Sequence, residues 1–362
     1  MGGPRVLLLG ASMGAGHDAV CAELARRLRT RGATAEICDV LTLLPPAAGP
    51  ALRAFYRGTV RHAPTLYAAI YALFLSPGDG PRPGSAPLAA TARNRLLSRV
   101  RAFRPDLVVP AFHLAAQITG RLRTEGALST PASVFVTDFA VHRGWLHPGN
   151  DLYVCLTERG ATTARAATGR PAAVSGPVVD PSFHRAADHS GDLGATAPRV
   201  PAGPPPVLLS TGAWGVGTHT VSTARLLAGH GCRPVLLCGR DERLRRRAAR
   251  VPGALALGWT DDMPGLMASA RLLVDNAAGQ TAAQALAAGV PVVTWRPLPG
   301  HGLAGARSMA AAGLTTYARD RGELLAAVGR LLGPGPERTG QVERGRGAFT
   351  ADAVDLLTRP VR

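Results

Sequence analysis

Apolar and polar positions alternate along the chain in a pattern that predicts strands followed by helices. Residues 5–9 form a nearly continuous apolar run, which is typical of a strand buried on both faces of a parallel sheet. We expect a helix over residues 18–31, because three apolar residues recur there at four-residue spacing while arginines occupy the other faces. Residues 34–40 are the next predicted strand. These segments form one βαβ unit.

The same alternation continues through the first half of the chain and starts again in the second half. Further strands of the first half are predicted at residues 106–110, 133–137 and 152–157. Residues 190–206 are rich in glycine, alanine and proline and have the composition of a linker. A second set of elements then begins with strands at residues 207–210 and 233–238, with a helix between them.

This pattern predicts an α/β fold with two Rossmann-like domains that face a cleft. The length of 362 residues suits two domains of about 150–200 residues each. The predicted divisions are an N-terminal domain over residues 1–189, a linker over 190–206, a C-terminal domain over 207–335, and a tail with a final helix over 336–362. Within this last part, we expect a loop up to residue 347 and a helix at 350–358.

Composition restricts the class of protein and its partners. Hydrophobic residues make up 46% of the chain, which excludes a disordered or fibrous protein. Lys+Arg number 41 against 24 for Asp+Glu, a net charge of +17, and every one of these cations is an arginine. Such a surface attracts phosphate-rich partners, whether nucleic acid, anionic lipid or nucleotide. No motif that reads nucleic acid is present, so we expect no nucleic-acid partner.

Cysteine usage and apolar runs indicate the compartment. The five cysteines are scattered and form no CxxC pair, which favours reduced, buried thiols in a cytoplasmic protein. The first apolar run is short and ends at a glycine, so it predicts a buried strand and not the core of a signal peptide. The longest apolar stretch, residues 66–75, is about half of the roughly 20 residues that a membrane span needs. We expect a cytoplasmic protein that is soluble or peripheral at a membrane.

Two glycine-rich turns follow the first strand of each half. The first contains Gly14 and Gly16, and the second contains Gly212, Gly215 and Gly217. Such a turn lets backbone N–H groups approach a phosphate, or it merely relieves steric crowding. Neither turn has the dehydrogenase fingerprint or a Walker lysine, so we expect no cofactor.

Candidate chemistry in the first half centres on His17 and on the loop after residue 137. His17 lies at the start of a helix, where the dipole favours its neutral form; it is a candidate general base, or it only packs the turn. Asp138, His142 and Trp145 follow a strand at the sheet edge where ligands bind, so they line one pocket or form an ordinary surface loop. The histidines lack the spacing of a zinc site, and no metal is expected.

The most informative segment of the second half runs from residues 257–263 through residues 275–287. A strand ends near Asp275, a turn of small residues follows, and a helix opens at about Thr281. Its N-terminal amides are suited to hold a diphosphate, with Gln284 reaching a sugar hydroxyl; alternatively, this is an alanine-rich helix packed on the sheet. Residues 51–75 interleave arginines with aromatic residues, which suits a membrane interface or helices with a solvated arginine face.

Taken together, these motifs resemble the monogalactosyldiacylglycerol synthase and processive diacylglycerol glucosyltransferase family. Its members are relatives of the peptidoglycan N-acetylglucosaminyltransferase and have the GT-B fold. The resemblance covers about residues 5–330 and rests on short segments in a fixed order. These segments are residues 14–17, 136–139 with His142 and Trp145, 176–178, 238–240, 258–263, the turn around Gly279 and Thr281, and 299–300.

The resemblance implies an inverting transfer of a hexose from a UDP-sugar to a lipid hydroxyl such as diacylglycerol, at an anionic membrane surface. The first domain would hold the acceptor and the second the nucleotide. The expected catalytic residues are His17 and Asp138. The expected acceptor-binding residues are Gly14, Gly16, His142 and Trp145. The expected donor-binding residues are Gly212, Gly215, Gly217, Cys238, Gly239, Trp259, Thr260, Gly279, Gln280, Thr281, Gln284, Gly300 and His301.

The chain departs from the family pattern at the expected donor site. Where the family has Lys-Pro-Gly-Gly, residues 276–279 are Asn-Ala-Ala-Gly, and Gln284 stands in place of a glutamate that grips the ribose. A glutamine lacks the charge-assisted grip of a carboxylate on a diol. The family's Pro-Gly-Gln-Glu is altered to Pro-Gly-His-Gly at residues 299–302. A UDP-sugar epimerase, a transferase to a non-lipid acceptor, and a relative that binds nucleotide or lipid without turnover are the alternatives.

Overall fold

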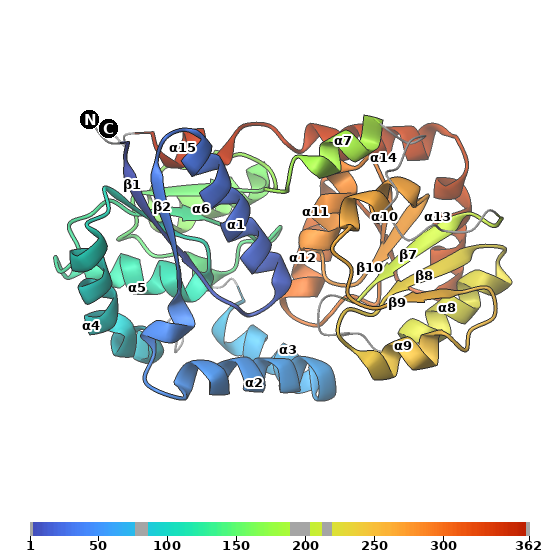
Figure 1. Ribbon diagram of the computed structural model, residues 1–362, viewed down its shortest axis with the longest axis horizontal. Coiled ribbons are helices and arrows are strands. Elements are labelled where there is room, and N and C mark those ends of the chain that lie inside the picture. Colours follow the sequence, from blue (N-terminus) through green and yellow to red (C-terminus); the bar gives the residue numbers. More distant parts are fainter. Residues whose placement is uncertain (1–2, 77–85, 189–202, 212–218, 360–362) are drawn as a thin grey trace. The chain divides into compact units, whose positions relative to one another are not determined.

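The computed structural model describes residues 3–76, 86–188, 203–211 and 219–359 and divides into two compact units (Figure 1). Unit 1 comprises Met1–Val178 and Phe349–Arg362, and unit 2 comprises Val179–Ala348. In both units the paired strands of the described residues run parallel. The α/β class predicted from the sequence is confirmed.

Unit 1 contains two three-stranded sheets of order β2-β1-β3 and β4-β5-β6. A parallel bridge between Val108 and Ala132 joins them. The strands are β1 (Arg5–Gly10), β2 (Thr34–Asp39), β3 (Leu107–Pro110), β4 (Ser133–Phe135), β5 (Leu152–Cys155) and β6 (Ala172–Val174). The helices are α1 (Ala15–Thr30), η1 (Val40–Leu43), α2 (Ala48–His62), α3 (Pro64–Phe74), α4 (Ala86–Phe103), α5 (His113–Thr124), η2 (Arg143–Trp145), α6 (Glu158–Thr168) and α15 (Ala353–Leu357).

The core of unit 1 forms around β1, as its apolar run predicts. Val6, Leu7, Leu8 and Leu9 are all fully buried, because the strand is central in its sheet and helices cover it. Helix α1 follows directly and contributes Leu24 to this core. The carboxyl end of β1 and the start of α1 are thereby fixed at one edge of the sheet.

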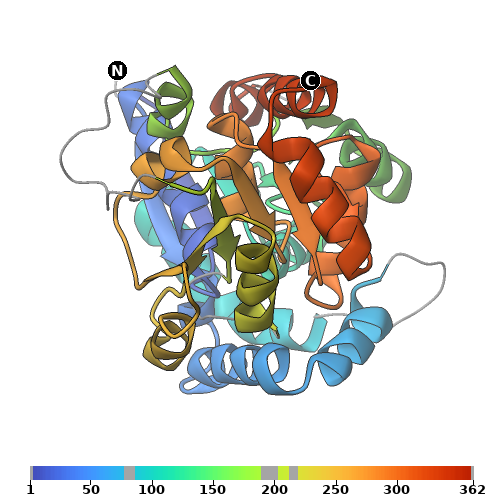
Figure 2. The ribbon, with the colours of Figure 1, turned by 90° about the vertical axis from the view of Figure 1, so that its right-hand side faces the viewer.

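Unit 2 contains one six-stranded sheet of order β12-β11-β10-β7-β8-β9. Helices surround this sheet (Figure 2). The strands are β7 (Pro206–Ser210), β8 (Arg233–Leu237), β9 (Leu255–Leu257), β10 (Leu272–Asp275), β11 (Val292–Trp295) and β12 (Thr316–Ala318). The helices are α7 (Ser182–Asp188), α8 (Thr220–Gly229), α9 (Glu242–Ala248), α10 (Met263–Ser269), α11 (Gln280–Ala287), α12 (His301–Ala311), α13 (Arg321–Leu332) and α14 (Pro336–Gly347).

The strand order of unit 2 is that of a Rossmann sheet, with the switch point between β7 and β10. At such a point, successive connections leave in opposite directions and open a crevice at the carboxyl ends of the strands. The turn after β10 is described, whereas residues 212–218 after β7 lie outside the described residues. The predicted donor-binding residues Gly212, Gly215 and Gly217 therefore lie outside the described residues.

The C-terminal part of the chain differs from its prediction. The stretch from about residue 333 to 347, expected to be a loop, contains α14 over Pro336–Gly347. Gln341 explains this helix: it is buried, and its side chain bonds both the N–H and the carbonyl of Val292 on β11. Gly345 lets the helix approach Leu286, because a Cβ there would lie 3.1 Å from Cδ2 of that leucine. The glycines permit close packing here and do not break the helix.

The two compact units also divide the chain at places other than those predicted. The boundary falls between Val178 and Val179, and residues 349–362 return to unit 1. The predicted final helix is present as α15. The carboxylate of its N-cap residue Asp352 pairs with Arg27 of α1 at 3.3 Å and with Arg31, the residue after α1, at 3.2 Å. The linker predicted at 190–206 lies mostly outside the described residues.

Two further sequence expectations concern thiols and membrane spans. All five cysteines are free and buried, as predicted, and burial raises the pKa of each thiol. Over the ranges that the structure describes, none of the helices combines the length and apolarity that a membrane crossing requires.

Candidate active site

His17 lies in the first turn of α1, directly after the glycine turn that follows β1. The helix begins at Ala15, three residues earlier than predicted, with Gly14 as its N-cap residue. Nδ1 of His17 lies 3.3 Å from Oγ1 of Thr137, and its ring meets Phe112 edge to face at 5.4 Å. The half-buried imidazole is therefore held by contacts from two other elements of unit 1.

Opposing influences set the protonation of His17. Burial lowers its pKa below the ordinary value, while the negative charge of Asp138, and after it that of Asp18, acts in the other direction. A buried histidine beside a carboxylate is neutral near pH 7 and is still able to accept a proton in a transition state. This arrangement suits a general base.

Asp138 follows β4 and accepts a hydrogen bond from the short turn η2. Nε1–H of Trp145 donates to its Oδ2 at 2.8 Å, and Nε2 of His142 lies 3.4 Å from the same oxygen. Trp145 is 0% exposed and His142 is 3% exposed. Both side chains contact the carboxylate of Asp138. Their predicted role in binding the acceptor stays a prediction.

Three tyrosines of α2 and α3 lie close enough to this carboxylate for its charge to affect them, and their sequence pattern did not mark them as site residues. Burial, followed by the charge of Asp138, raises the pKa of Tyr56 and of Tyr71 to about 12. Burial and nearby charges also raise the pKa of Tyr67. Tyr67 and Tyr71 are four residues apart and both buried, so they form one inward face of α3. Their spacing was the available signal, but it did not show what they faced.

The glycine of the first turn is not required by the protein's own packing. A Cβ built at Gly14 would meet no atom within 4 Å. Its φ of 163° is extended backbone that any residue adopts. Steric relief is thus no explanation for this glycine, whereas close approach of a ligand is one. Gly16 lies two residues further on, in the first turn of α1 and immediately before His17.

The turn after β10 in unit 2 is built on a buried carboxylate. Asp275 is 2% exposed and accepts from the N–H groups of Ala277 at 3.0 Å and Ala278 at 2.6 Å. Burial raises the pKa of Asp275 in spite of these donors. Ala278 has a φ of 49°, the left-handed conformation that a glycine adopts without strain. Gly279 at the end of this turn is the N-cap residue of α11, and no side chain makes a capping hydrogen bond there.

The start of α11 therefore offers backbone donors at the switch point of the sheet. The first N–H groups of a helix lack intrahelical partners and carry its partial positive charge. A Cβ at Gly279 would reach only Cβ of Ala277, at 4.0 Å, so packing does not require this glycine either. Gln280 and Thr281 form the first turn, and Gln284 lies half-buried one turn later.

The loop before α12 lies against this turn. N–H of Leu298 donates to the carbonyl of Asn276 at 2.7 Å. Gly300 has a φ of 75° and caps α12, whose first residue is His301. The predicted residues Gly279, Gly300 and His301 thus belong to two loops that the structure brings together.

A second group of predicted donor residues lies at the ends of β8 and β9. Trp259 is 47% exposed, its Nε1–H donates to Asp261 at 3.0 Å, and the guanidinium of Arg240 lies 4.8 Å from its ring centroid. Thr260 accepts from the N–H of Asp262 at 3.3 Å. Cys238 is fully buried, so only its backbone and that of Gly239 are placed to meet a ligand.

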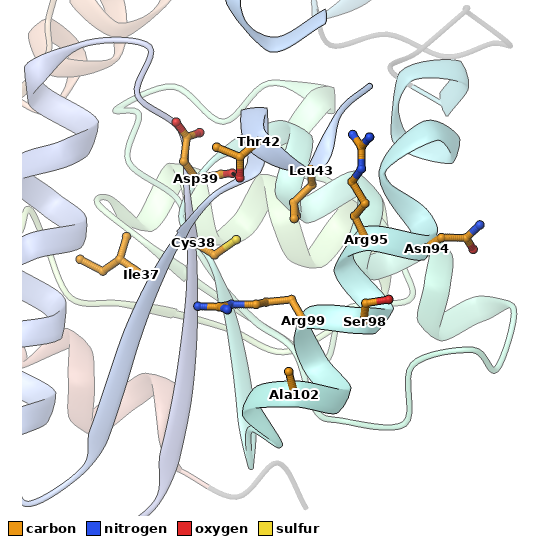
Figure 3. Close-up of a pocket in the computed structure, with 10 residues that line it drawn as sticks. All are labelled: Ile37, Cys38, Asp39, Thr42, Leu43, Asn94, Arg95, Ser98, Arg99 and Ala102. Atoms are coloured by element: carbon orange, nitrogen blue, oxygen red, sulfur yellow. Dashed lines mark hydrogen bonds between the residues drawn. The ribbon is translucent and has the colours of Figure 1, made fainter. Parts of the chain in front are cut away.

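One further cavity, of about 610 Å³, lies in unit 1 and contains none of the predicted site residues. Figure 3 shows Arg95, Ser98 and Arg99 of α4 on one side of it and Cys38, Asp39 and Thr42 on the other. Arg99 reaches Glu36 of β2 at 2.6 Å. Among the residues of the described ranges, no cluster of three or more His, Cys, Asp or Glu is arranged to hold a metal ion.

Comparison with known proteins relates this site to a family. The family model described as monogalactosyldiacylglycerol (MGDG) synthase matches residues 17–179. A processive diacylglycerol beta-glucosyltransferase of Bacillus cereus is 25% identical over 339 residues, which cover 91% of this chain and 86% of that protein. The matched segment begins at His17 and contains Asp138 and the η2 turn.

Solved structures identify the fold. A glycotransferase of kitacinnamycin matches with a TM-score of 0.65 at 15% identity and covers 99% of this chain and 100% of that one. MurG of Acinetobacter baumannii matches with a TM-score of 0.59 at 14% identity and covers 98% of each chain. The fold is that of the GT-B glycosyltransferases, and the protein is a glycosyltransferase. The resemblance to the monogalactosyldiacylglycerol synthase and diacylglycerol glucosyltransferase family, inferred from the motifs, is confirmed.

Proposed function

We propose that this glycosyltransferase moves a hexose from a UDP-sugar to a lipid hydroxyl, such as that of diacylglycerol, with inversion at the anomeric carbon. Unit 1 would bind the acceptor beside His17, and unit 2 would bind the nucleotide. The observation that carries the proposal is a half-buried His17 that contacts Thr137 and on which the charge of Asp138 acts, after a turn whose Gly14 the packing does not require. The match of the MGDG synthase family model to residues 17–179 supports the lipid acceptor.

In the proposed reaction, His17 takes the proton of the acceptor hydroxyl. The hydroxyl oxygen forms a bond to the anomeric carbon while the bond from that carbon to the diphosphate oxygen breaks. UDP leaves with the bonding electron pair, and one displacement inverts the configuration. For this role Nδ1–H of His17 donates to Oγ1 of Thr137, which leaves the lone pair of Nε2 for the proton.

The donor site of the proposal combines the two groups of unit 2 residues. N–H groups at the start of α11, around Gly279, would balance the diphosphate charge, with Gly212, Gly215 and Gly217 as further expected partners. The exposed face of Trp259 would meet the nucleobase. No tightly bound metal is needed in this scheme.

The outer face of α2 and α3 supports peripheral contact with an anionic membrane. Phe55, Leu66 and Leu73 are large apolar side chains that are 52%, 49% and 53% exposed. Arg57 and Arg61 lie on the same pair of helices, which are coloured light blue in Figure 1. Apolar side chains interleaved with arginines suit the boundary between lipid headgroups and acyl chains.

The test is incubation of the purified protein with radiolabelled UDP-hexoses and vesicles that contain diacylglycerol, beside a His17→Ala variant. Label in an organic-extractable product, lost in the variant, is the expected result and identifies the sugar. A thermal shift with UDP but no product would indicate another acceptor or a relative that only binds. Neither product nor shift with any nucleotide would refute the donor site around Gly279.

A further inference from the structure

The backbone of η2 determines which nitrogen of His142 faces Asp138. N–H of Gly144 donates to Nδ1 of His142 at 3.1 Å, so Nδ1 is an acceptor and the ring proton of the neutral imidazole is on Nε2. Nε2 is the nitrogen that lies 3.4 Å from Oδ2 of Asp138. Together with Nε1–H of Trp145, it directs a second N–H toward the same carboxylate oxygen.

The η2 turn is itself held in place from α5 and by its own glycine. Nε2 of Gln117 donates to the carbonyls of Gly144 at 3.0 Å and Leu146 at 2.9 Å. A Cβ at Gly144 would lie 2.9 Å from Cε1 of His142 and 2.9 Å from Cδ2 of Leu75. A side chain at residue 144 would therefore displace the imidazole that faces Asp138.

We propose that Trp145 and His142 are positioning residues that hold the carboxylate of Asp138, in its charged form, toward the catalytic His17. They contact neither substrate; they act through Asp138. The inference rests on the proposed role of His17 as the base. The indole N–H on Oδ2, with Nε2 of His142 3.4 Å from the same oxygen, fixes the orientation of a carboxylate whose charge acts on the neighbouring tyrosines.

Other charged and titratable groups face this network from the neighbouring elements. Asp138 faces Tyr56 of α2, and Tyr67 and Tyr71 of α3. His142 meets the rings of Tyr71 at 5.9 Å and His113 of α5 at 5.2 Å. Near His17, Asp18 is a second negative charge, and Asp18 in turn faces Asp39 and Arg53. The charges of Asp138 and Asp18 both act to raise the pKa of His17.

The expected pH effect follows from the sign of that interaction. The charge of Asp138 favours protonated His17, so weakening it lowers the pKa of His17. Since the base must be neutral to act, the acidic limb of kcat/KM moves to lower pH while the maximal rate falls. We expect Asp138→Asn to shift the limb to lower pH. Trp145→Phe, which removes only the indole N–H, should shift it in the same direction by less, with a rate loss of roughly ten-fold.

The experiment measures the pKa of His17 directly, by NMR of protein labelled at histidine Cε1, with the resonance assigned from its absence in His17→Gln. Lower values in Asp138→Asn, Trp145→Phe and His142→Phe are expected. In His142→Gln the Nε2 donor of the glutamine occupies a place similar to that of Nε2 of His142. The pKa of His17 in this variant should therefore equal the wild-type value, unlike that in His142→Phe. Circular dichroism checks the fold of each variant.

The matched control is Trp295→Phe in unit 2. Trp295 is also buried, and its Nε1–H donates to Thr223 at 3.1 Å, so the change deletes the same kind of bond elsewhere. The control Trp295→Phe should leave the pKa of His17 unchanged. If Trp145→Phe also leaves it unchanged, the indole is only structural and the inference is overturned. A shifted pKa in protein that transfers no hexose would uphold the positioning role and reject the proposed reaction.

Discussion

Single residues with left-handed backbone are places where the chain stores strain. Ala47, the N-cap residue of α2, has a φ of 66° and is exposed. An L side chain in this region costs about 1–2 kcal/mol, and an exposed methyl group contributes little packing in return. We expect Ala47→Gly to raise the free energy of unfolding by about 1 kcal/mol, as measured by urea denaturation.

The same substitution in the middle of the helix is the control. Ala54 is exposed on α2 with helical backbone, so Ala54→Gly should lower the stability by about 1 kcal/mol. Opposite signs for the two variants assign the effect to backbone conformation. Equal signs would contradict it.

Gln284 is the residue at which the sequence departs most clearly from the donor motif of the family. If the proposed nucleotide site is correct, Gln284→Glu supplies a charge-assisted acceptor for the ribose hydroxyls. Charged hydrogen bonds exceed neutral ones by about 1 kcal/mol, so UDP should bind roughly five-fold more tightly by calorimetry.

A carboxylate at the start of the same helix should act in the opposite direction. Gln280 is the first residue of α11, where the proposal places the diphosphate, and Gln280→Glu adds a like charge there. Weaker UDP binding in this variant and tighter binding in Gln284→Glu would locate the ribose and the phosphates along the helix. An unchanged affinity in both variants argues against a donor site at α11.

At the scale of elements, α2 and α3 carry two different faces. Tyr67 and Tyr71 are buried toward Asp138, whereas Phe55, Leu66 and Leu73 face outward. The interleaved arginines and aromatics of residues 51–75 left both a membrane interface and a packed helix pair open. The burial pattern shows that the two are compatible, because the aromatic residues that pack are not the ones that are exposed.

A variant with Phe55, Leu66 and Leu73 all changed to serine should lose binding to anionic vesicles. Partial burial of three such side chains contributes a few kcal/mol, so the loss should be at least roughly ten-fold in a co-sedimentation assay. Ile37→Ser is the matched control, since Ile37 is 42% exposed but lies on β2. An equal loss in both variants, or none in the triple variant, would contradict the proposed membrane face.

Periodicity predicted the central strands of both units and the helix after β1, because these segments bury apolar faces; the short edge strands β6, β9 and β12 were not predicted. It predicted α14 wrongly, since Gln341 satisfies the backbone of Val292 only once the sheet exists. Contacts that form only in the folded chain are likewise missing from the pattern. The turns around His17 and Asp138 marked these two residues as candidates for the site, but the hydrogen bond from Trp145 to Asp138 was not predictable. A tryptophan in a loop after a strand does not reveal whether it faces a ligand or a carboxylate.

At the scale of the whole molecule, both chain ends belong to unit 1, so unit 2 is an insertion between Val178 and Phe349. Two features attach the returning segment to unit 1. N–H of Thr350 donates to the carbonyl of Ser175 at 3.1 Å, and Asp352 pairs with Arg27 and Arg31. Val354 and Leu357 of α15 are buried. We infer that unit 1 depends on α15 for part of its stability.

A substitution at Asp352 tests how much the stability of unit 1 depends on α15 and leaves the packing of the helix in place. Although burial alone would raise it, the pKa of Asp352 is lowered by the N–H of Val354 and by the charges of Arg27 and Arg31. A group with a lowered pKa in the folded state stabilises the protein above its unfolded value, about 3.9, and this stabilisation is lost as pH falls through the folded value. Asp352→Asn keeps the helix cap but removes the charge, so it should cost about 0.5–1 kcal/mol at pH 7 and nothing at strongly acidic pH.

Hydrogen exchange measures which helices and strands lose stability when the charge of Asp352 is removed. If α15 stabilises unit 1 alone, Asp352→Asn should increase exchange in α1 and in β4 and β5, which α15 contacts, and leave α13 of unit 2 unchanged. Asp352→Ala, which also removes the cap on Val354, should cause a larger change in the same elements. Faster exchange throughout both units would show instead that they unfold as one cooperative body, in which case α15 supports the whole chain.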